Sequence, residues 1–127
     1  MEIHESAEDY LETILKLKER QGQVRSIDIV NEMGYSKPSI SVAMKRLREN
    51  GYILMDTEGY ITLTKPGLDV AERIYGRHKL LTKFLLSLGV SEKNAAADAC
   101  KIEHDLSDET YEKLKELAEK HLQHRPV

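Results

Sequence analysis

The chain has 127 residues, 40% of them hydrophobic, and a formal net charge of −3, which is enough for one compact domain or for a small domain with a helical extension. It contains no apolar run of about 18 residues, which excludes a membrane-spanning helix. The acidic start, Met1 to Glu5, has no apolar core and argues against a signal peptide. Cys100 is the single cysteine, so no internal disulfide can form and a reducing, cytoplasmic location is expected.

The first 50 residues carry apolar side chains at helical spacing. They predict helices over residues 6–20, 26–33 and 36–50, each followed by a glycine that can end a helix. The third helix begins at Ser36, tolerates Pro38 in its first turn and is locally basic. Two short helices joined by a glycine-containing turn are typical of a helix-turn-helix. The apolar positions of its second helix are Ile40, Val42, Ala43, Met44 and Leu47.

Two strand-like runs, residues 52–55 and 60–64, flank a polar turn and predict a β-hairpin in the position of a wing. Beyond it, helices are expected over 68–88, 91–106 and 107–121. The predicted fold is mainly α with a small β-hairpin wing: a winged helix-turn-helix domain over 1–66, followed by a helical dimerisation domain over 67–127. Domains this small bury a limited share of their surface, so a homodimer is expected.

The start of the third helix concentrates groups suited to reading DNA. The first residues of a recognition helix face base edges, and flanking basic groups hold phosphates. Serine hydroxyls can bond to bases, and a proline can contact a thymine methyl group. We therefore predict double-stranded operator DNA as the partner. The expected contact residues are Ser36, Lys37, Pro38, Ser39 and Ser41 at the groove, Lys45 and Arg46 at phosphates, and Thr57 with its neighbours Glu58 and Gly59 in the wing.

Three groups of side chains of the types that bind metals lie outside the predicted DNA-contact residues. Cys100, Glu103 and His104 stand at i, i+3 and i+4 of a predicted helix and share one face. Asp9 and Glu12 give two oxygen donors at i and i+3 of the first helix, and His78 places an imidazole within the long helix. Each group alone is weak evidence for a metal site, because such side chains are more often buried or solvated than bound to a metal. Spacing alone does not show that they meet.

The chain resembles the diphtheria-toxin-repressor family of metal-dependent regulators, in particular its short members, the manganese transport regulators. The resemblance covers nearly the whole chain and rests on the motifs at 8–14, 36–41, 77–81 and 99–107. It implies a homodimeric repressor of metal-uptake genes that needs no small-molecule substrate and is not an enzyme. In that family the metal lies between the first helix and the dimerisation helices. The implied ligands are Asp9, Glu12, His78, Cys100, Glu103 and His104.

Position 100 departs from the manganese-type pattern. Manganese-type members carry Glu there, whereas Cys is the iron-type residue, although Asp9 and Glu12 match the manganese type. Thiolate favours Fe(II), Co(II) or Zn(II), and carboxylate suits Mn(II). The expected cofactor is Mn(II) or Fe(II), with Zn(II) or Co(II) binding in vitro. Whether Cys100 is a ligand and whether one or two metals bind per subunit stay open.

Three other interpretations compete with this one. A metal-independent winged-helix regulator would respond to an organic ligand in a large apolar pocket. A winged-helix protein-interaction module would show no affinity for DNA even at low salt. Cys100 as a nucleophile, with His104 as its base, lacks a recognisable oxyanion-stabilising loop, and no motif of an enzyme stands out.

Overall fold

The computed structural model describes residues 5–123; residues 1–4, on which the signal-peptide argument rests, and 124–127 lie outside the described part. The chain divides into two compact units, an N-terminal unit (Met1–Arg73) and a C-terminal unit (Ile74–Val127). The division falls within the long helix α4 (Lys65–Ser87). Helices and one antiparallel hairpin make up the fold, as predicted. Among the described residues, no helix combines the length and the apolar character needed to cross a membrane.

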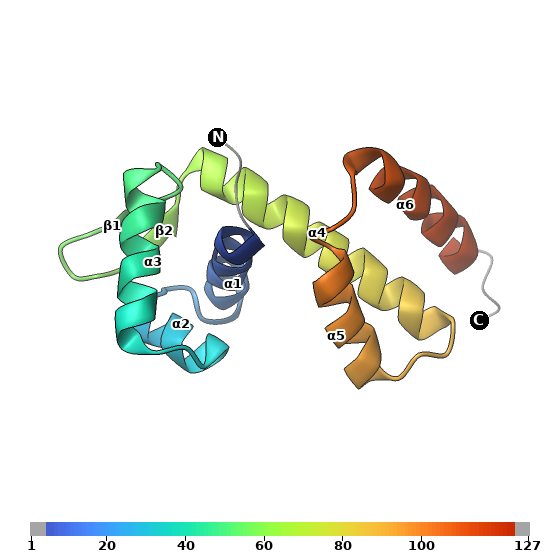
Figure 1. Ribbon diagram of the computed structural model, residues 1–127, viewed down its shortest axis with the longest axis horizontal. Coiled ribbons are helices and arrows are strands. Elements are labelled where there is room, and N and C mark those ends of the chain that lie inside the picture. Colours follow the sequence, from blue (N-terminus) through green and yellow to red (C-terminus); the bar gives the residue numbers. More distant parts are fainter. Residues whose placement is uncertain (1–4, 124–127) are drawn as a thin grey trace. The chain divides into compact units, whose positions relative to one another are not determined.

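The N-terminal unit packs three helices and the hairpin around one apolar core (Figure 1). Its elements are α1 (Glu5–Gln21), α2 (Ser26–Met33), α3 (Lys37–Glu49), β1 (Ile53–Met55) and β2 (Ile61–Leu63). The strands pair with Ile53 opposite Leu63 and Met55 opposite Ile61. The Ile61 N–H donates to Val24 O at 2.7 Å, which ties the hairpin to the segment between α1 and α2. The core is built from Leu11, Ile14, Leu17, Val24, Ile29, Ile40, Met44, Leu47, Ile53 and Ile61.

Local signals place the helix-turn-helix where the sequence predicts it. Gly34 ends α2 in the left-handed conformation, with φ of 74°, which glycine adopts without steric cost. Ser36 caps α3: its Oγ accepts a hydrogen bond from the Ser39 N–H at 3.2 Å. Pro38 lies in the first turn of α3, where its missing N–H is not needed.

One apolar position of α3 does not face the core. Val42 is 52% exposed, whereas Ile40 and Met44 are buried. Val42 follows Ile40 by two residues, a rotation of about 200° around an α-helix, so the two side chains point to opposite faces. An apolar residue therefore stands on the solvent face of this helix.

The start of α4 also differs from the prediction. The helix begins at Lys65 instead of residue 68, because Pro66 fits into a first helical turn. Gly67 permits this start: a Cβ atom at that position would lie 2.0 Å from the backbone oxygen of Tyr52. The side-chain Oγ1 of Thr64 donates to Gly51 O at 2.6 Å, which joins the end of the hairpin to the end of α3.

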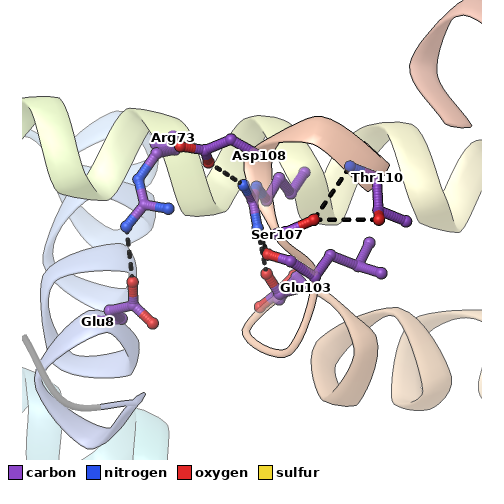
Figure 2. Close-up of polar contacts among 8 residues, drawn as sticks. Glu8, Arg73, Glu103, Ser107, Asp108 and Thr110 are labelled. Carbon is purple, nitrogen blue, oxygen red and sulfur yellow. Dashed lines mark hydrogen bonds and ion pairs between the residues drawn. The ribbon is translucent and has the colours of Figure 1, made fainter. Parts of the chain in front are cut away.

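The C-terminal unit contains the rest of α4 together with α5 (Glu92–Ile102) and α6 (Asp108–Gln123) (Figure 1). Ser91 caps α5 by accepting a hydrogen bond from the Asn94 N–H at 3.3 Å. Ser107 caps α6 in the same manner, accepting from the Thr110 N–H at 3.1 Å (Figure 2). The buried apolar residues of this unit are few and mostly small: Ile74, Leu81, Ala95, Ala99 and Ala118.

Helix α5 is shorter than predicted. It ends at Ile102 instead of near Leu106, and the backbone then turns before α6. Glu103 is the last residue bonded to the helix, its N–H donating to Ala99 O at 3.0 Å. His104 therefore lies in the turn and not on a helical face shared with Cys100, contrary to the i, i+4 expectation.

Candidate metal centre and DNA-reading surface

The predicted DNA-reading residues of α3 lie on its exposed face. Lys37, Pro38, Ser39, Ser41, Lys45 and Arg46 are all exposed, as is Ser36. The Ser36 hydroxyl is engaged in the cap, since it also donates to Ser39 Oγ at 2.8 Å. Lys45 lies 3.9 Å from the Glu49 carboxylate, and both side chains are largely exposed. Val42 is exposed on the same helix, and it was not among the DNA-contact residues predicted from the sequence.

The wing is held from both sides of its turn. Asp56 Oδ1 accepts hydrogen bonds from the N–H groups of Glu58 and Tyr60, each at 2.9 Å. The Arg25 guanidinium lies 4.2 Å from the centre of the Tyr60 ring, which packs the base of the wing against the start of α2. Thr57 is exposed at the tip, as a phosphate-contacting role requires.

A second aromatic contact lies beside the entry to α3. Tyr35, which precedes the Ser36 cap, is 50% exposed, and its ring meets the Tyr10 ring edge-on at 6.2 Å. Burial raises the pKa of Tyr10, and the neighbouring Tyr35 acts in the same direction. This pair connects α1 directly to the start of the DNA-reading helix.

Helix α1 carries three carboxylates within little more than one turn. Glu8 and Glu12 are buried, with 7% and 4% exposure, and Asp9 is half-buried. Glu8 accepts from Arg73 Nη2 at 2.8 Å (Figure 2), and Lys16 Nζ lies 3.9 Å from Glu12. Burying a carboxylate costs several kcal/mol unless positive charge compensates it. The predicted donors Asp9 and Glu12 thus lie in a region of the N-terminal unit that favours cations.

In the C-terminal unit, three predicted ligands come together around one carboxylate. Glu103 is fully buried, and its Oε2 lies 3.0 Å from His78 Nδ1. Its other oxygen, Oε1, lies 3.5 Å from His104 Nε2 and accepts no hydrogen bond from any residue in the described range 5–123. A buried carboxylate oxygen without a donor is costly and is suited to a cation. Two imidazoles and a carboxylate are a donor set that fits Mn(II), Fe(II) or Zn(II).

The remaining predicted ligand of this unit lies beside that cluster. Cys100 lies on the last turn of α5 and is exposed, and its Sγ lies within 4.8 Å of a Glu103 carboxylate oxygen. Asp9 and Glu12 belong to the N-terminal unit. The structure thus brings His78, Cys100, Glu103 and His104 together within one unit.

Arg77 is a polar residue of this region that the sequence analysis did not single out. Its side chain is 2% exposed, although it carries a charge. Burial raises the pKa of the neighbouring Tyr111, whereas the Arg77 charge, 4.7 Å from the Tyr111 ring centre, lowers it. A sequence signal existed, because Arg77 interrupts the buried stripe of α4 between Ile74 and Leu81 at helical spacing.

Comparison with known proteins identifies both halves of the chain. Residues 2–63 match the family described as "Iron dependent repressor, N-terminal DNA binding domain". Residues 64–126 match "Iron dependent repressor, metal binding and dimerisation domain". An uncharacterized HTH-type transcriptional regulator, MJ0568, of Methanocaldococcus jannaschii is 37% identical over 120 residues, covering 93% of this chain and 96% of that protein. The transcriptional regulator MntR of Escherichia coli O157:H7 is 35% identical over 117 residues, covering 92% of this chain and 76% of that protein.

Solved structures agree with this assignment. The manganese regulator SloR superposes with a TM-score of 0.76 at 30% identity, covering 95% of this chain and 55% of that chain. A manganese-dependent transcriptional repressor in complex with manganese gives a TM-score of 0.79 at 29% identity, covering 88% of this chain and 52% of that chain. This chain spans about half the length of these solved relatives. The resemblance seen in the sequence is confirmed: the chain belongs to the iron-dependent repressor family of metal-dependent, DNA-binding transcriptional regulators, which are not enzymes.

Proposed function

We propose that this protein is a homodimeric repressor of metal-uptake genes that binds operator DNA in the cytoplasm when Mn(II) or Fe(II) is bound. Residues 1–66 would form the DNA-binding domain and residues 67–127 the metal-binding and dimerisation domain. The observation that carries the proposal is the buried cluster of His78, Glu103 and His104, in which Glu103 Oε1 accepts no hydrogen bond from the described residues. The family supports the general activity, and the cluster supports the metal as the signal.

The ligand set that we propose contains all six side chains expected from the sequence. His78, Glu103 and His104 would hold the ion in the C-terminal unit, and Asp9 and Glu12 would add oxygen donors from α1. When bound, a divalent ion supplies positive charge that compensates the carboxylates. Without that charge, the carboxylates of Asp9, Glu12 and Glu103 would repel one another if brought together. Metal binding and DNA binding would then be coupled, typically by about 1–3 kcal/mol.

Cys100 is the residue on which the choice between the two metals depends. Imidazole and carboxylate donors suit Mn(II), whereas a thiolate favours Fe(II), Co(II) or Zn(II). The exposed thiol of Cys100 lies on the turn of α5 that precedes Glu103, within the same segment as the buried ligand. We propose that Fe(II) and Mn(II) both activate the protein, and that the Cys100 thiolate biases the site toward Fe(II).

The DNA contacts that we propose use the exposed face of α3 and the wing. Lys37, Pro38, Ser39 and Ser41 would approach base edges, with Ser36 holding the helix start. Val42 would add an apolar contact of the kind that a thymine methyl group accepts. Lys45, Arg46 and Thr57 would bind phosphates. In a dimer, two such helices would enter successive major grooves about 34 Å apart.

The homodimer is supported by large apolar side chains exposed on the C-terminal unit. Leu86, Leu88, Ile102 and Leu117 are 36–57% exposed, although the unit's own core is small. Covering such side chains in an interface contributes about 25 cal/mol per Å² of apolar surface. Exposed apolar surface of this kind is typical of a dimerisation domain.

The rival organic-ligand regulator predicts a large apolar pocket. The C-terminal unit has an open groove of about 460 Å³ between α4 and α6. Its lining includes Lys79, Lys83 and Lys115, three ammonium groups that an apolar ligand would have to desolvate. Leu80, Tyr111 and Leu122 line it beside these lysines, so the groove is open and mixed in character, not the apolar pocket that the rival function requires.

The test is the metal dependence of DNA binding. Duplexes would be selected from a random pool with Mn(II) present, and their affinity for the full chain would be measured by fluorescence anisotropy, anaerobically, with chelator, Mn(II) or Fe(II). We expect at least a fivefold gain with metal and loss of that gain in Glu103→Gln. Glu116→Gln is the matched control, since Glu116 is 63% exposed on α6. Equal affinity with chelator and with metal would contradict the proposal and leave a metal-independent regulator; no selectable duplex would indicate a protein-interaction module.

A further inference from the structure

Two proposed metal ligands depend on a turn instead of a helix. Helix α5 ends at Ile102, so Glu103 stands at the helix end and His104 in the turn that leads to α6. Within this turn, the Asp105 N–H donates to Ile102 O at 3.0 Å. A turn has more accessible backbone conformations than a helix interior. The positions of both ligands therefore depend on what holds the turn.

Arg77, on the neighbouring helix α4, holds this turn at both of its ends. Its Nη1 donates to the backbone oxygen of Glu103 at 3.1 Å and to that of Leu106 at 2.9 Å. One of these carbonyl groups belongs to a proposed ligand itself. Both bonds come from the same nitrogen, so one donor group of the rigid guanidinium fork holds the two ends of the turn together.

The surroundings of Arg77 hold the guanidinium itself in place. Its Nη2 donates to Asp108 Oδ1 at 2.6 Å, at the start of α6 (Figure 2). The Tyr111 ring lies beside it, with a centroid distance of 4.7 Å. With 2% exposure, the charge is out of water, and a buried charge persists only where such partners compensate it. Arg77 is therefore ordered by partners on α6 while it holds the end of α5.

We propose that Arg77 is a positioning residue for the metal ligands Glu103 and His104. It touches neither of their donor atoms. Its hydrogen bonds to the turn set where the Glu103 carboxylate and the His104 imidazole stand relative to His78, the next residue along α4. One segment of α4 thus supplies a ligand and fixes two others. This inference rests on the proposed metal-dependent function.

The experiment compares Arg77→Met and Arg77→Lys with the unaltered chain, using Co(II) as an absorbing probe under anaerobic conditions. We expect Co(II) affinity, measured by competition with a chelator, to fall about 10–100-fold in Arg77→Met, as when groups that orient metal ligands are removed. The visible Co(II) bands should shift, because the ligand geometry changes. Arg77→Lys, whose single ammonium lacks the second fork nitrogen that bonds Asp108, should recover part of the affinity. In the metal-free protein, amide hydrogen exchange at residues 103–107 should be faster in Arg77→Met.

Leu81→Ala is the matched control, since Leu81 lies on the same helix and is buried but makes no hydrogen bond to the turn. It should lower the melting temperature of the metal-free protein while leaving the Co(II) bands unchanged. Wild-type affinity and bands in Arg77→Met would overturn the positioning role, even though the chain binds metal. If Arg77→Met does not fold, wild-type affinity and bands in Arg77→Lys would overturn it equally. Absence of Co(II) binding by the unaltered chain would instead refute the proposed function.

Discussion

Replacing Glu103 with glutamine should make the metal-free protein more stable and the metal-loaded protein less stable than the unaltered chain. The Glu103 carboxylate is fully buried and its Oε1 accepts no hydrogen bond from the described residues, so its charge bears an uncompensated desolvation penalty of several kcal/mol that a neutral amide of the same shape would not bear. Glutamine keeps a hydrogen-bonding group near His78, so the hydrogen bond to the imidazole can be retained without the carboxylate charge.

The magnitude follows from two opposing terms. Losing the charge-assisted bond between Glu103 Oε2 and His78 Nδ1, 3.0 Å long, costs about 1.5–3 kcal/mol. Relief of the desolvation penalty, several kcal/mol per ion, exceeds this loss. We therefore expect the metal-free variant to gain about 1–2 kcal/mol, or roughly 3–8 °C in melting temperature for a chain of this size. Metal at 100 times its dissociation constant should stabilise the unaltered chain by about 2.7 kcal/mol and the variant hardly at all.

The assay is thermal unfolding followed by circular dichroism, with chelator and with Mn(II), for the unaltered chain, Glu103→Gln and the exposed control Glu116→Gln. The order of the melting temperatures should reverse: compared with the unaltered chain, Glu103→Gln melts at a higher temperature without metal and at a lower temperature with it. A clear drop in melting temperature of the metal-free variant would refute the reasoning, because it would show that the carboxylate contributes net stability by itself. An unchanged metal-induced shift in the variant would remove Glu103 from the ligand set.

Three further outcomes are expected. Gly67→Ala should lower the free energy of unfolding in urea by about 1–3 kcal/mol, because the added Cβ would lie 2.0 Å from the Tyr52 backbone oxygen; an unchanged value would contradict the close approach. Lys45→Ala should weaken binding to every duplex and reduce the slope of log affinity against log salt by about one, whereas Val42→Ala should change base preference and leave that slope unchanged. Tyr111 has a folded-state pKa above its ordinary value of 10.0, chiefly through burial. The neutral hydroxyl therefore contributes fully to the free energy of unfolding below pH 10, and this contribution is lost as the pH rises through the folded-state pKa. Tyr111→Phe should reduce the fall in the free energy of unfolding on alkaline titration.

The sequence was a reliable guide wherever a short stretch of chain determines its own conformation. Ser36, Pro38 and Gly34 specify the end of α2 and the start of α3 through caps and backbone preferences that need no distant partner. The hairpin follows from two strand-like runs around a polar turn. These local signals, together with helical periodicity, were enough to predict the winged helix-turn-helix.

A distant partner explains the misplaced end of α5. Helix α5 was predicted to continue to about Leu106. Instead, Arg77 donates hydrogen bonds to carbonyl groups of the turn, including that of Glu103, which lies 26 residues further along the chain. Val42 was predicted only as an apolar position of its helix, and its exposure on the face opposite Ile40 was not predicted. The end of α5 depends on a residue outside the local segment, so periodicity alone could not detect it, whereas the exposure of Val42 follows from its own position on the helix.

The proposed metal ligands illustrate the same limit. His78 and Glu103 are 25 residues apart in sequence, yet their side chains lie 3.0 Å apart. Spacing could group Glu103 with Cys100 and His104 on one stretch of chain, but it could not show that His78 joins them. That expectation came from the resemblance to a family, and the complete set of six ligands remains a prediction.

The burial of the proposed ligands also determines where metal preference can change during evolution. Glu12 shares α1 with Leu11 and Ile14, which are completely buried, so a new donor at position 12 has to be accommodated by the surrounding core. Cys100 is exposed at the end of α5, and exchanging its thiol for a carboxylate would disturb little packing. A lineage could therefore move between metals by substitutions at position 100 while the rest of the ligand set stays constant.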